Sequence, residues 1–520
     1  MALRKHSHGG AVRNVDQVRR QHSQPKPLAR SVQIGERTLS VPQNHDQAPQ
    51  PERGAREDLR DAQQLAEAGE LDQAWALVDK YLTYVNPDDA AALTVATQIW
   101  FKQRKNIIAH SFAKRACAVQ PDNAFAWANL GMLEEQLYRF DEATAAFKAG
   151  LAVAKSDDAR GSLYLNWACA LVNAGDWLNA EDMCRRALRL RPNSAKAKAN
   201  LGMTLLALKR WREGWPLYDA VIGFDNSRRR VQYRDEPVWD GTPGKRLVIY
   251  GEQGLGDEIS FASMVPDAIA AARSVVIDCT EKLAGLFRRS FPAATVYGTR
   301  WETGLGWDRR HAEIDASVSI GGLGKLYRNE AGDFGNGDAY LVADPERRSM
   351  WRALFDKQKK PVIGIGWTGG VPWTGDRYRK WTLEQLLPVF RSVDAVWVSL
   401  QYKDAGKEIA EFKSKHPEID IRQYSYATLT QDYDDTAAMV AELDLVFSMQ
   451  TGVIHLAGAL GKDCWCFVHS RSQWRYGTHT ERMMPWYRSV KLYRQARDGA
   501  WPFGEAIGDL HKRYEHHTAD

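Results

Sequence analysis

Two glycine-containing segments have the composition of ligand-binding loops. In the first, the apolar run 246–250 leads into Gly251, Gly254 and Gly256, with Asp257 directly after them. Glycine allows positive φ and a close approach of the backbone to a ligand. The helix expected after this loop begins with free N–H groups and a partial positive charge, which favour an anion. The first segment is therefore a candidate substrate-binding loop.

The second segment follows the apolar run 444–448. It contains Gln450, Thr451 and Gly452, with His455 one turn further on. The small residues after Gly452 favour a closely packed helix whose first N–H groups face the same cleft. Neither segment has the spacing of a dinucleotide fingerprint or the Gly-Lys-Ser/Thr ending of a P-loop. We therefore expect neither a Rossmann dehydrogenase nor a P-loop ATPase, and the two loops are expected to bind another ligand.

Composition limits the classes of protein to which the chain can belong. It has 520 residues, of which 44% are apolar, and this is enough for about three domains. A net charge of +5, from 70 basic and 65 acidic residues, does not favour nucleic acid as a partner. The sequence has no apolar run of about 18 residues and no signal peptide, so a cytoplasmic protein is expected. The six cysteines lack metal-ligand spacing, and no metal or redox site is predicted.

Polar segments are interpreted as tail or surface. Residues 1–54 are rich in Gln, His, Pro and Arg and lack helical or strand periodicity, so they are predicted to be a disordered tail. Their four histidines are irregularly spaced and are read as incidental composition. The short basic runs 228–230 and 347–348 lack interleaved aromatic residues and are interpreted as solvated surface.

An internal repeat occupies residues 55–222. Small residues recur at steps of 34, 37 and 34 residues, at Ala109, Ala143, Ala180 and Gly214. An Ala-Asn-Leu-Gly sequence also recurs, at 128–131 and 199–202. The repeat resembles the tetratricopeptide family and predicts about four or five helical units stacked into a solenoid, whose concave face commonly holds a peptide. The turn-rich segment 223–244 is expected to be a linker, so that the solenoid folds apart from the C-terminal half of the chain.

From residue 245 onward, strand candidates alternate with helical segments, which is typical of parallel βαβ units. The first series is expected at 246–250, 274–279, 295–297 and 316–320, and the second at 361–367, 395–400, 419–424, 443–447 and 464–468. The two series predict two Rossmann-like lobes, 245–345 and 346–520, the second with C-terminal helices. The expected fold class is a helical solenoid followed by a pair of α/β lobes around a cleft.

Five motifs appear in order between residues 245 and 497, at 251–257, 363–368 with 379–384, 432–437, 448–461 and 485–495. Together they resemble the tetratricopeptide-linked relatives of the bacterial family 9, heptosyltransferase-like, glycosyltransferases. The resemblance implies a GT-B fold and a nucleotide-sugar donor held mainly by the second lobe. It also implies an acceptor held mainly by the first lobe, and neither a catalytic metal nor another cofactor.

The resemblance implies roles for single residues. Asp257 matches the acid of the first loop and is the expected base that deprotonates the acceptor, with Glu258 and Glu252 as lower-ranked alternatives. Arg379 and Lys380 match the basic position after the first strand of the second lobe, where either one is expected to hold the diphosphate. The other expected donor contacts are Gln450, Thr451, Gly452 and His455.

Plainer interpretations stay open at this stage. Asp257 is also suited to complement a helix dipole. The basic pair 379–380 is equally consistent with a solvated loop. His455 is also consistent with a packing residue near a helix start. Residues 434–436 look like a helix-capping turn beside the donor. The aromatic and basic residues within 474–487 either shape the donor pocket or pack against the C-terminal helices.

Gln450 departs from the family pattern. Heptosyltransferases have Asp at this position, so the carboxylate expected at the donor sugar is absent. The leading hypothesis is a metal-independent inverting glycosyltransferase, hexosyl- or heptosyltransferase-like, that moves a sugar to a protein or glycan acceptor recruited by the repeats. The alternative is a non-catalytic tetratricopeptide scaffold with a degenerate transferase domain. A nucleotide-sugar epimerase is a third hypothesis, but it gives no reason for peptide-binding repeats.

Overall fold

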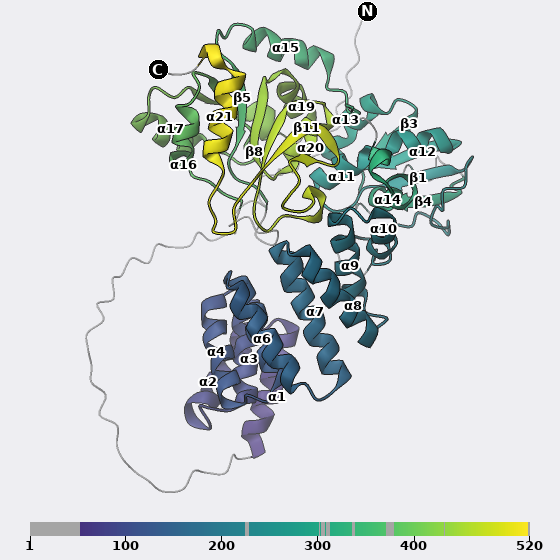
Figure 1. Ribbon diagram of the computed structural model, residues 1–520. Helices are drawn as coiled ribbons and strands as arrows, with labels where there is room; N and C mark the ends of the chain where they lie inside the picture. The colour runs from purple at the N-terminus through teal and green to yellow at the C-terminus, as the bar shows by residue number, and fades with distance from the viewer. Residues whose placement is uncertain are drawn as a thin grey trace, which may run out of the picture. The chain divides into compact units, whose positions relative to one another are not determined.

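The computed structural model describes residues 53–223, 228–300, 302, 307, 313–334, 338–370, 379–430 and 432–517. The predicted tail and its histidines thus lie outside the described residues, except that the first helix already begins at Arg53. Residues 53–520 form one compact unit. In Figure 1 the helical part runs from purple to blue, and the two sheets run from teal to yellow.

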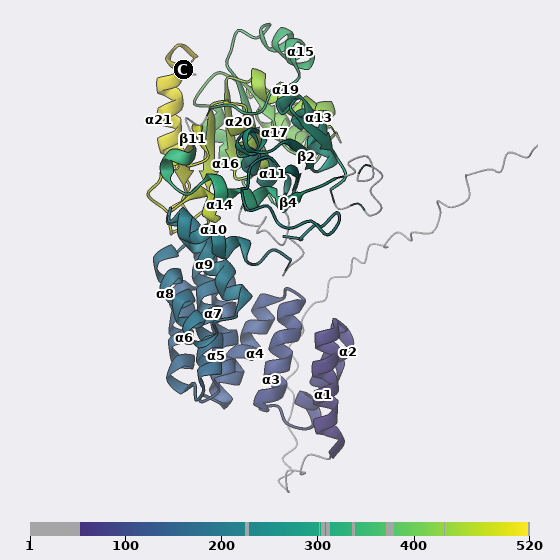
Figure 2. The same cartoon turned by 90° about the vertical axis from the view of Figure 1, so that its right-hand side faces the viewer.

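Helical hairpins form the first part of the described chain. Their helices are α1 (Arg53–Ala68), α2 (Leu71–Tyr84), α3 (Ala90–Lys102), α4 (Asn106–Val119), α5 (Ala124–Gln136), α6 (Phe140–Val153), α7 (Asp157–Ala174), α8 (Trp177–Leu190), α9 (Ala195–Ala207) and α10 (Trp211–Asp219). The second helices of the hairpins begin 35, 34, 37 and 34 residues apart. These are tetratricopeptide-like repeats, and they follow one another in chain order (Figure 2).

Short polar side chains start the first helix of most hairpins. The carboxylate, amide or hydroxyl of the capping residue accepts a hydrogen bond from a backbone N–H of the first turn, as the side chains of Asp89, Asn123, Ser156 and Ser194 do for α3, α5, α7 and α9. Such a cap typically stabilises a helix by about 1 kcal/mol. The small residues that repeat in sequence are buried where the two helices of a hairpin meet, which permits close packing.

The last hairpin does not fold apart from the α/β part, contrary to the sequence-based expectation. Trp215 of α10 is 1% exposed, and its Nε1 donates to the backbone oxygen of Arg328 at 2.7 Å. The predicted linker is also packed, because Trp239 is buried and Val238 bridges to Ser317. One apolar cluster runs from the last repeats through both sheets. The aromatic face of α10 is therefore part of the α/β core.

The repeats also contact the α/β part through ion pairs. Arg471 lies against the α5–α6 corner, where it donates to Oε1 of Glu135 at 2.5 Å and lies 4.0 Å from the ring centre of Tyr138. Glu135 is buried, and the side chains of Arg471 and Glu135 are 9% and 4% exposed. Lys209 pairs with Glu481 at 3.0 Å.

Lobe one contains a parallel four-stranded sheet with the order β3-β2-β1-β4. Its strands are β1 (Arg246–Tyr250), β2 (Ser274–Asp278), β3 (Ala294–Tyr297) and β4 (Ala316–Ser319). Its helices are α11 (Leu255–Ala262), α12 (Val265–Ala271), α13 (Glu281–Ser290) and α14 (Gly324–Tyr327), with short 3₁₀ turns η1 (Ile320–Leu323) and η2 (Ala331–Phe334).

Lobe two contains a seven-stranded sheet with the order β10-β11-β9-β8-β5-β6-β7, parallel except where β10 meets β11. Its strands are β5 (Val362–Gly366), β6 (Val396–Ser399), β7 (Ile421–Gln423), β8 (Leu445–Met449), β9 (Cys464–Val468), β10 (Met483–Met484) and β11 (Tyr487–Arg494). Its helices are α15 (Pro345–Phe355), α16 (Leu383–Phe390), α17 (Gly406–Lys415), α18 (Ser425–Thr428), α19 (Tyr433–Glu442), α20 (Gly452–Ala459) and α21 (Phe503–Arg513), with 3₁₀ turns η5 (Trp474–Tyr476) and η6 (Glu515–His517).

Every strand expected from the sequence is present, with ends that differ by at most two residues. Strands β10 and β11 were not predicted. The lobes contact each other where α11 meets α20 and where α13 meets α19. The second contact is reinforced by an ion pair between Arg289 and Asp434.

One predicted surface residue is buried. Arg228 is 4% exposed, and its Nε donates to Glu252 at 2.8 Å. Its guanidinium carbon lies 3.9 Å from the ring centre of Tyr218. The interpretation of residues 228–230 as solvated surface is therefore wrong for Arg228, because a run of like charges does not reveal which member meets a distant carboxylate.

Candidate functional site

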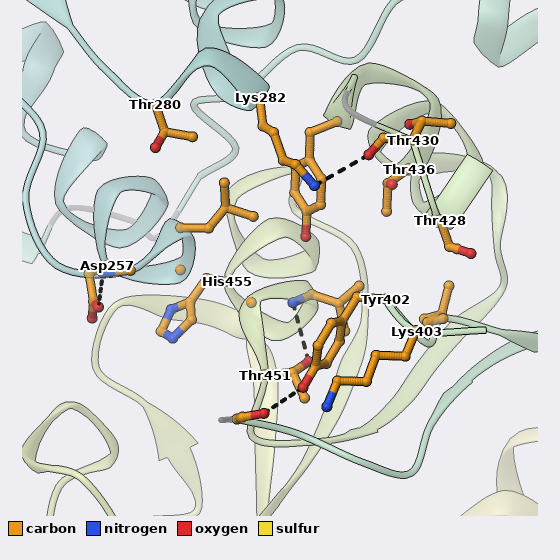
Figure 3. Close-up of a pocket in the computed structure, with 18 of the residues that line it drawn as sticks. Asp257, Thr280, Lys282, Tyr402, Lys403, Thr428, Thr430, Thr436, Thr451 and His455 are labelled. Carbon is orange, nitrogen blue, oxygen red and sulfur yellow. Dashed lines mark hydrogen bonds between the residues drawn. The ribbon is translucent and has the colours of Figure 1, made fainter. Parts of the chain in front are cut away.

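A cleft of about 870 Å³ lies between the lobes. Its walls come from the start of α11, from residues that follow β2 and β3 in lobe one, and from residues that follow β6 and β8 in lobe two. Ligands of open parallel sheets bind at these carboxyl ends of the strands. Figure 3 shows side chains of both lobes pointing into the cleft, so we take it as the candidate site.

The first glycine loop differs from its predicted conformation. The glycines Gly251, Gly254 and Gly256 have no positive φ, and the residue with φ of 59° is Gln253. The side chain of Gln253 is held at both ends, because its Nε2 donates to Tyr218 and its Oε1 accepts from Arg475 at 3.1 Å. These bonds offset the strain of a left-handed non-glycine residue.

Close approach does occur at this loop. A Cβ on Gly256 would lie 2.8 Å from Cδ2 of His455 in α20, so only glycine lets α11 and α20 meet here. A Cβ on Gly251 would lie 2.6 Å from the carboxyl carbon of Glu258. Gly254 and Gly256 line the cleft, whereas Gly251 makes room for a buried carboxyl group instead.

Asp257 lines the cleft and already has a partner for each oxygen. Its Oδ2 accepts from the backbone N–H of Gly254 at 2.9 Å, which closes the first turn of α11. Its Oδ1 lies 2.8 Å from Nη2 of Arg475, whose side chain is 4% exposed. The helix-start role that the sequence left open for Asp257 is thus present, together with an ion pair that no local pattern indicates.

The two lower-ranked alternatives to Asp257 lie outside the cleft. Glu258 is fully buried, accepts from the backbone N–H of Thr280 at 3.0 Å and pairs with Arg300. Glu252 is 1% exposed and is paired with Arg228. Neither carboxylate lines the cleft, so neither can take a proton from a ligand bound there.

The second helix start faces the first. The hydroxyl of Thr451 accepts from the backbone N–H of Val453 at 3.3 Å and caps α20. A Cβ at Gly452 would meet no atom closer than Oη of Tyr433 at 3.8 Å, so this position is not crowded. The first turn of α20 therefore presents its partial positive charge to the cleft without a neutralising carboxylate of its own.

His455 lies in the next turn of α20, between the two helix starts. Its Nδ1 is 3.3 Å from Oη of Tyr487. Burial lowers the pKa of His455 to about 4, although the nearby Asp257 acts in the opposite direction. The imidazole is therefore neutral at physiological pH, and it lines the cleft as a group that can form hydrogen bonds without adding a charge.

Gln450 joins the ends of two neighbouring strands. It is 3% exposed, and its Oε1 accepts from the backbone N–H of His469 at 3.1 Å. Its backbone oxygen accepts from Nη1 of Arg379 at 3.2 Å. The amide at the position where heptosyltransferases have a carboxylate is thus bonded to the backbone directly after β9.

The structure separates the two basic residues that were predicted as candidates to hold the diphosphate. Arg379 lines the main cleft, and its backbone oxygen accepts from Gly369 at 2.8 Å. Lys380 is exposed, bridges to Thr368 and lines an adjoining cavity of about 250 Å³. Only Arg379 is placed to contact a ligand in the main cleft.

Two lysines of the cleft were not found by sequence reasoning. Lys282, after β2, points into the cleft from lobe one and donates to the backbone oxygen of Thr430 at 3.3 Å (Figure 3). Lys403, after β6, enters from lobe two beside Tyr402 (Figure 3). Each follows a parallel strand at its carboxyl end, and that position was the available signal.

The turn at 434–436 has mixed roles. Asp432 caps α19 by accepting from Asp434 at 2.8 Å, so the cap lies before the predicted residues. Asp434 and Asp435 pair with arginines, Asp435 with Arg347 at 3.1 Å. Thr436 lines the cleft.

Residues of the segment 474–487 pack in the core next to the cleft and contact side chains that line it. Trp474 and Trp486 pack with Trp215 in the shared core, with ring centres 5.7 and 6.4 Å away from that of Trp215. From the same segment, Arg475 holds Asp257, and Tyr487 contacts His455. Packing accounts for the tryptophans, while Tyr476 also lines the cleft.

Two negative findings concern the described residues only. None of their helices has the length and apolar character needed to cross a membrane. They also contain no cluster of three or more His, Cys, Asp or Glu side chains that is arranged to hold a metal ion.

Comparison with known proteins shows the family to which the chain belongs. No family model matches it. Protein FlbA of Caulobacter vibrioides is 31% identical to it over 417 residues, which are 75% of this chain and 67% of FlbA. The chain belongs to the FlbA family.

Solved structures resemble parts of the chain. A tetratricopeptide protein of Thermus thermophilus is 22% identical, and the match covers 32% of this chain and 90% of that one with a TM-score of 0.29. PilW, a type IV pilus biogenesis factor, is 19% identical, and the match covers 47% of this chain and 96% of PilW with a TM-score of 0.33. Each covers less than half of the chain.

Proposed function

We propose that the protein is a metal-independent inverting glycosyltransferase with a GT-B arrangement, which moves a sugar from a nucleotide-sugar to an acceptor recruited by the repeats. One observation carries the proposal. The capped but uncharged start of α20 and the side chain of Arg379 face a cleft at the carboxyl ends of two parallel sheets. Departure of a nucleoside diphosphate needs positive charge and N–H donors at that place.

The donor diphosphate would lie against lobe two. The first turn of α20 offers backbone N–H groups at Gly452, and Arg379 supplies a guanidinium. Lys282 and Lys403 add positive charge from the two sides of the cleft. Together these groups would stabilise the negative charge that develops on the leaving diphosphate.

The acceptor would be deprotonated by Asp257. Each oxygen of this carboxylate has one partner, so each keeps a second lone pair for an acceptor hydroxyl. The acceptor oxygen attacks the anomeric carbon as the bond from that carbon to the diphosphate oxygen breaks. The proton passes to Asp257 and the electron pair leaves with the diphosphate. Arg475 is a positioning residue that fixes the carboxylate at the cleft.

Ligand binding gives the first test. A panel of nucleoside diphosphates and nucleotide-sugars is added to the full chain, and the midpoint of thermal unfolding is followed. A ligand that binds only the native state must raise the midpoint. At a ligand concentration of a hundred times its Kd, it adds about 2.7 kcal/mol to the free energy of unfolding. The bound nucleotide-sugar is then incubated with candidate acceptors, and release of nucleoside diphosphate is measured. If no nucleotide raises the midpoint, the proposal fails.

A non-catalytic scaffold is the second candidate function. The observation that favours it is that both oxygens of Asp257 and the amide oxygen of Gln450 already have partners within the fold. A scaffold would bind its partner through the repeats while the cleft released no nucleoside diphosphate from any donor. Nucleotide binding with turnover excludes the scaffold, and partner binding without either one supports it.

A further inference from the structure

The loop before α11 contains a glutamine where backbone geometry favours glycine. Gln253 has φ of 59°, whereas its neighbours Gly251, Gly254 and Gly256 have no positive φ. Glycine reaches this left-handed region without strain, and other residues are strained there. Backbone shape alone therefore gives no reason for glutamine at this position, and the reason must lie in its side chain.

The side chain of Gln253 connects the repeats to lobe two. Its Nε2 donates to Oη of Tyr218 in α10 at 2.5 Å, and its Oε1 accepts from Nη2 of Arg475 in η5 at 3.1 Å. A guanidinium has donors and no acceptor, so Arg475 must meet the oxygen end of the carboxamide. The nitrogen end then faces Tyr218, and the orientation of the amide follows from its two partners.

The same nitrogen of Arg475 contacts the carboxylate at the cleft. Its Nη2 lies 2.8 Å from Oδ1 of Asp257. Within the part of the chain that the structure describes, Asp257 and Gln253 are the only hydrogen-bonding or ion-pairing partners of this guanidinium. The N–H bonds of a guanidinium form a rigid planar fork. A hydrogen bond to Gln253 through one N–H of Nη2 therefore directs the other N–H toward Asp257.

Aromatic rings and burial leave this task to Gln253. The central carbon of the guanidinium lies 4.5 Å from the ring centre of Trp474 and 5.0 Å from that of Phe261. Such contacts with ring faces leave rotation within the guanidinium plane open, and the bond to Gln253 removes that freedom. The side chain of Arg475 is 4% exposed, so water has little access to replace the amide.

We propose that Gln253 and Tyr218 are positioning residues for the proposed proton transfer. They set the guanidinium of Arg475, which in turn sets the carboxylate of Asp257 at the cleft. Neither Gln253 nor Tyr218 lines the cleft, so both act through Arg475 and not by contact with a substrate. Their catalytic role rests on the proposed function, whereas the hydrogen bonds that it needs do not.

Tyr218 makes the last repeat part of this support. The ring centres of Tyr218 and Trp474 are 5.4 Å apart, and Trp474 directly precedes Arg475. Trp215, one turn earlier on α10, packs on the same tryptophan at 5.7 Å. A displacement of α10 would therefore move the amide of Gln253 and the guanidinium together. The repeats that recruit the acceptor in the proposed function would thus also hold the base that activates it.

Gln253→Gly separates a positioning role from a backbone role. Glycine adopts the observed φ without strain, so a backbone role predicts full activity. Positioning predicts that kcat for transfer falls about ten- to a hundredfold, because a catalytic group displaced by about 1 Å can have an effect of that size. KM for the nucleotide-sugar should change less than about threefold, since the proposed donor site is at α20.

Arg104→Gly is the matched control. Arg104 is exposed in the turn between α3 and α4, where it has φ of 61°. Its replacement relieves the same kind of backbone strain away from the cleft, so kcat should equal that of the parent chain. A second variant, Tyr218→Phe, removes one oxygen and keeps the ring, and kcat should fall about two- to tenfold. Gln253→Gly added to Arg475→Lys should lower kcat less than about threefold further, because residues that act through one partner are not additive.

A crystal structure of Gln253→Gly tests the geometry without turnover. The closest distance between Arg475 nitrogen and Asp257 oxygen should exceed about 4 Å, the limit of an ion pair. Circular dichroism checks that each variant is folded. Parent-like kcat in Gln253→Gly, or an ion pair that stays in place, overturns the proposal. A parent chain that releases no nucleoside diphosphate contradicts the proposed function and the catalytic role together. In that case the crystal structure separately decides whether Gln253 holds Arg475.

Discussion

The two helices that meet across the cleft begin in different ways. At the start of α11, the carboxylate of Asp257 folds back onto the N–H of Gly254 and pairs with Arg475. At the start of α20, the cap is the neutral hydroxyl of Thr451, and a Cβ at Gly452 would meet no atom closer than 3.8 Å. One helix fills its anion-binding position with its own side chain, whereas the other leaves it open.

This difference indicates which helix start is suited to the negatively charged part of a ligand. A phosphate at α11 would meet the carboxylate of Asp257, and like charges at close range destabilise a complex. A phosphate at α20 would meet N–H groups, a helix dipole and Arg379. In the proposed reaction, the diphosphate therefore belongs to lobe two and the acceptor hydroxyl to lobe one. Substitutions at either helix start test that assignment.

The largest expected effect is at the start of α11. Asp257→Asn keeps the size of the side chain but removes the proposed proton acceptor, so transfer should fall by about 10²–10⁴. Affinity for the nucleoside diphosphate should change less than about threefold, because the proposed donor site is at α20. Release of nucleoside diphosphate measures the first effect and calorimetry the second. Asp235→Asn, at an exposed carboxylate in the segment that precedes lobe one, is the control for lost charge. Normal turnover by Asp257→Asn would remove it from the mechanism.

His455, between the two helix starts, should make the stability of the fold depend on pH in the acid range. Burial lowers the pKa of His455 to about 4 in the fold, whereas an unfolded histidine titrates near pH 6.5. Between these values the unfolded chain binds more protons, so stability is lost as pH falls from about 6.5 to about 4, by up to about 3 kcal/mol for this group. Urea unfolding of the parent chain and of His455→Asn, each at pH 7 and pH 4.5, isolates the contribution of His455 to the loss of stability. An identical pH dependence in both proteins would contradict this assignment.

The start of α20 should carry the donor affinity. Arg379→Ala is expected to weaken binding of a nucleoside diphosphate about ten- to a hundredfold, since a charge-assisted contact is typically worth about 1.5–3 kcal/mol. Lys380→Ala is the matched control, because the neighbouring residue faces the adjoining cavity, and it should change affinity less than about threefold. Calorimetry compares the two. Equal losses would show that the separation of the two side chains does not matter for binding.

The smallest expected effect concerns the glycines at the two helix starts. In Gly256→Ala, the new methyl group would lie 2.8 Å from His455 and 3.3 Å from Cα of Gly452, so we expect a loss of about 1–3 kcal/mol of stability. In Gly452→Ala, the nearest atom is 3.8 Å away, and stability should change by less than about 0.5 kcal/mol. Denaturant unfolding measures both. Similar values would mean that the contact between α11 and α20 is looser than the distances indicate.

The strands were predictable because buried parallel strands are short apolar runs between turn residues. The strand β11 was missed for the opposite reason. Tyr487–Arg494 mixes charged and apolar residues, and it lies near the edge of the sheet, with the two-residue strand β10 on its outer side. The predicted C-terminal helices correspond to α21 and the short turn η6.

Only those parts of the site that leave a local pattern in the sequence could be predicted. The glycine loops follow strand ends, and two of the three glycines of the first loop line the cleft. The partners of single residues depend on distant parts of the chain, as for Asp257 with Arg475, or Arg228 with Glu252. Such pairs leave no mark within a short window of sequence. Positive φ at Gln253 also required knowledge of its two side-chain partners.

The largely buried ion pair of Arg471 and Glu135 restricts how this architecture can be recombined. An exchange that replaced α5 with a foreign helix would leave the guanidinium of Arg471 buried without its carboxylate, which is strongly destabilising. The hairpins α1–α2 and α3–α4 precede α5 in the chain and make none of the contacts described for the cleft. Hairpins can therefore be gained or lost at the N-terminal end of the array, while those from α5 onward are inherited together with the cleft.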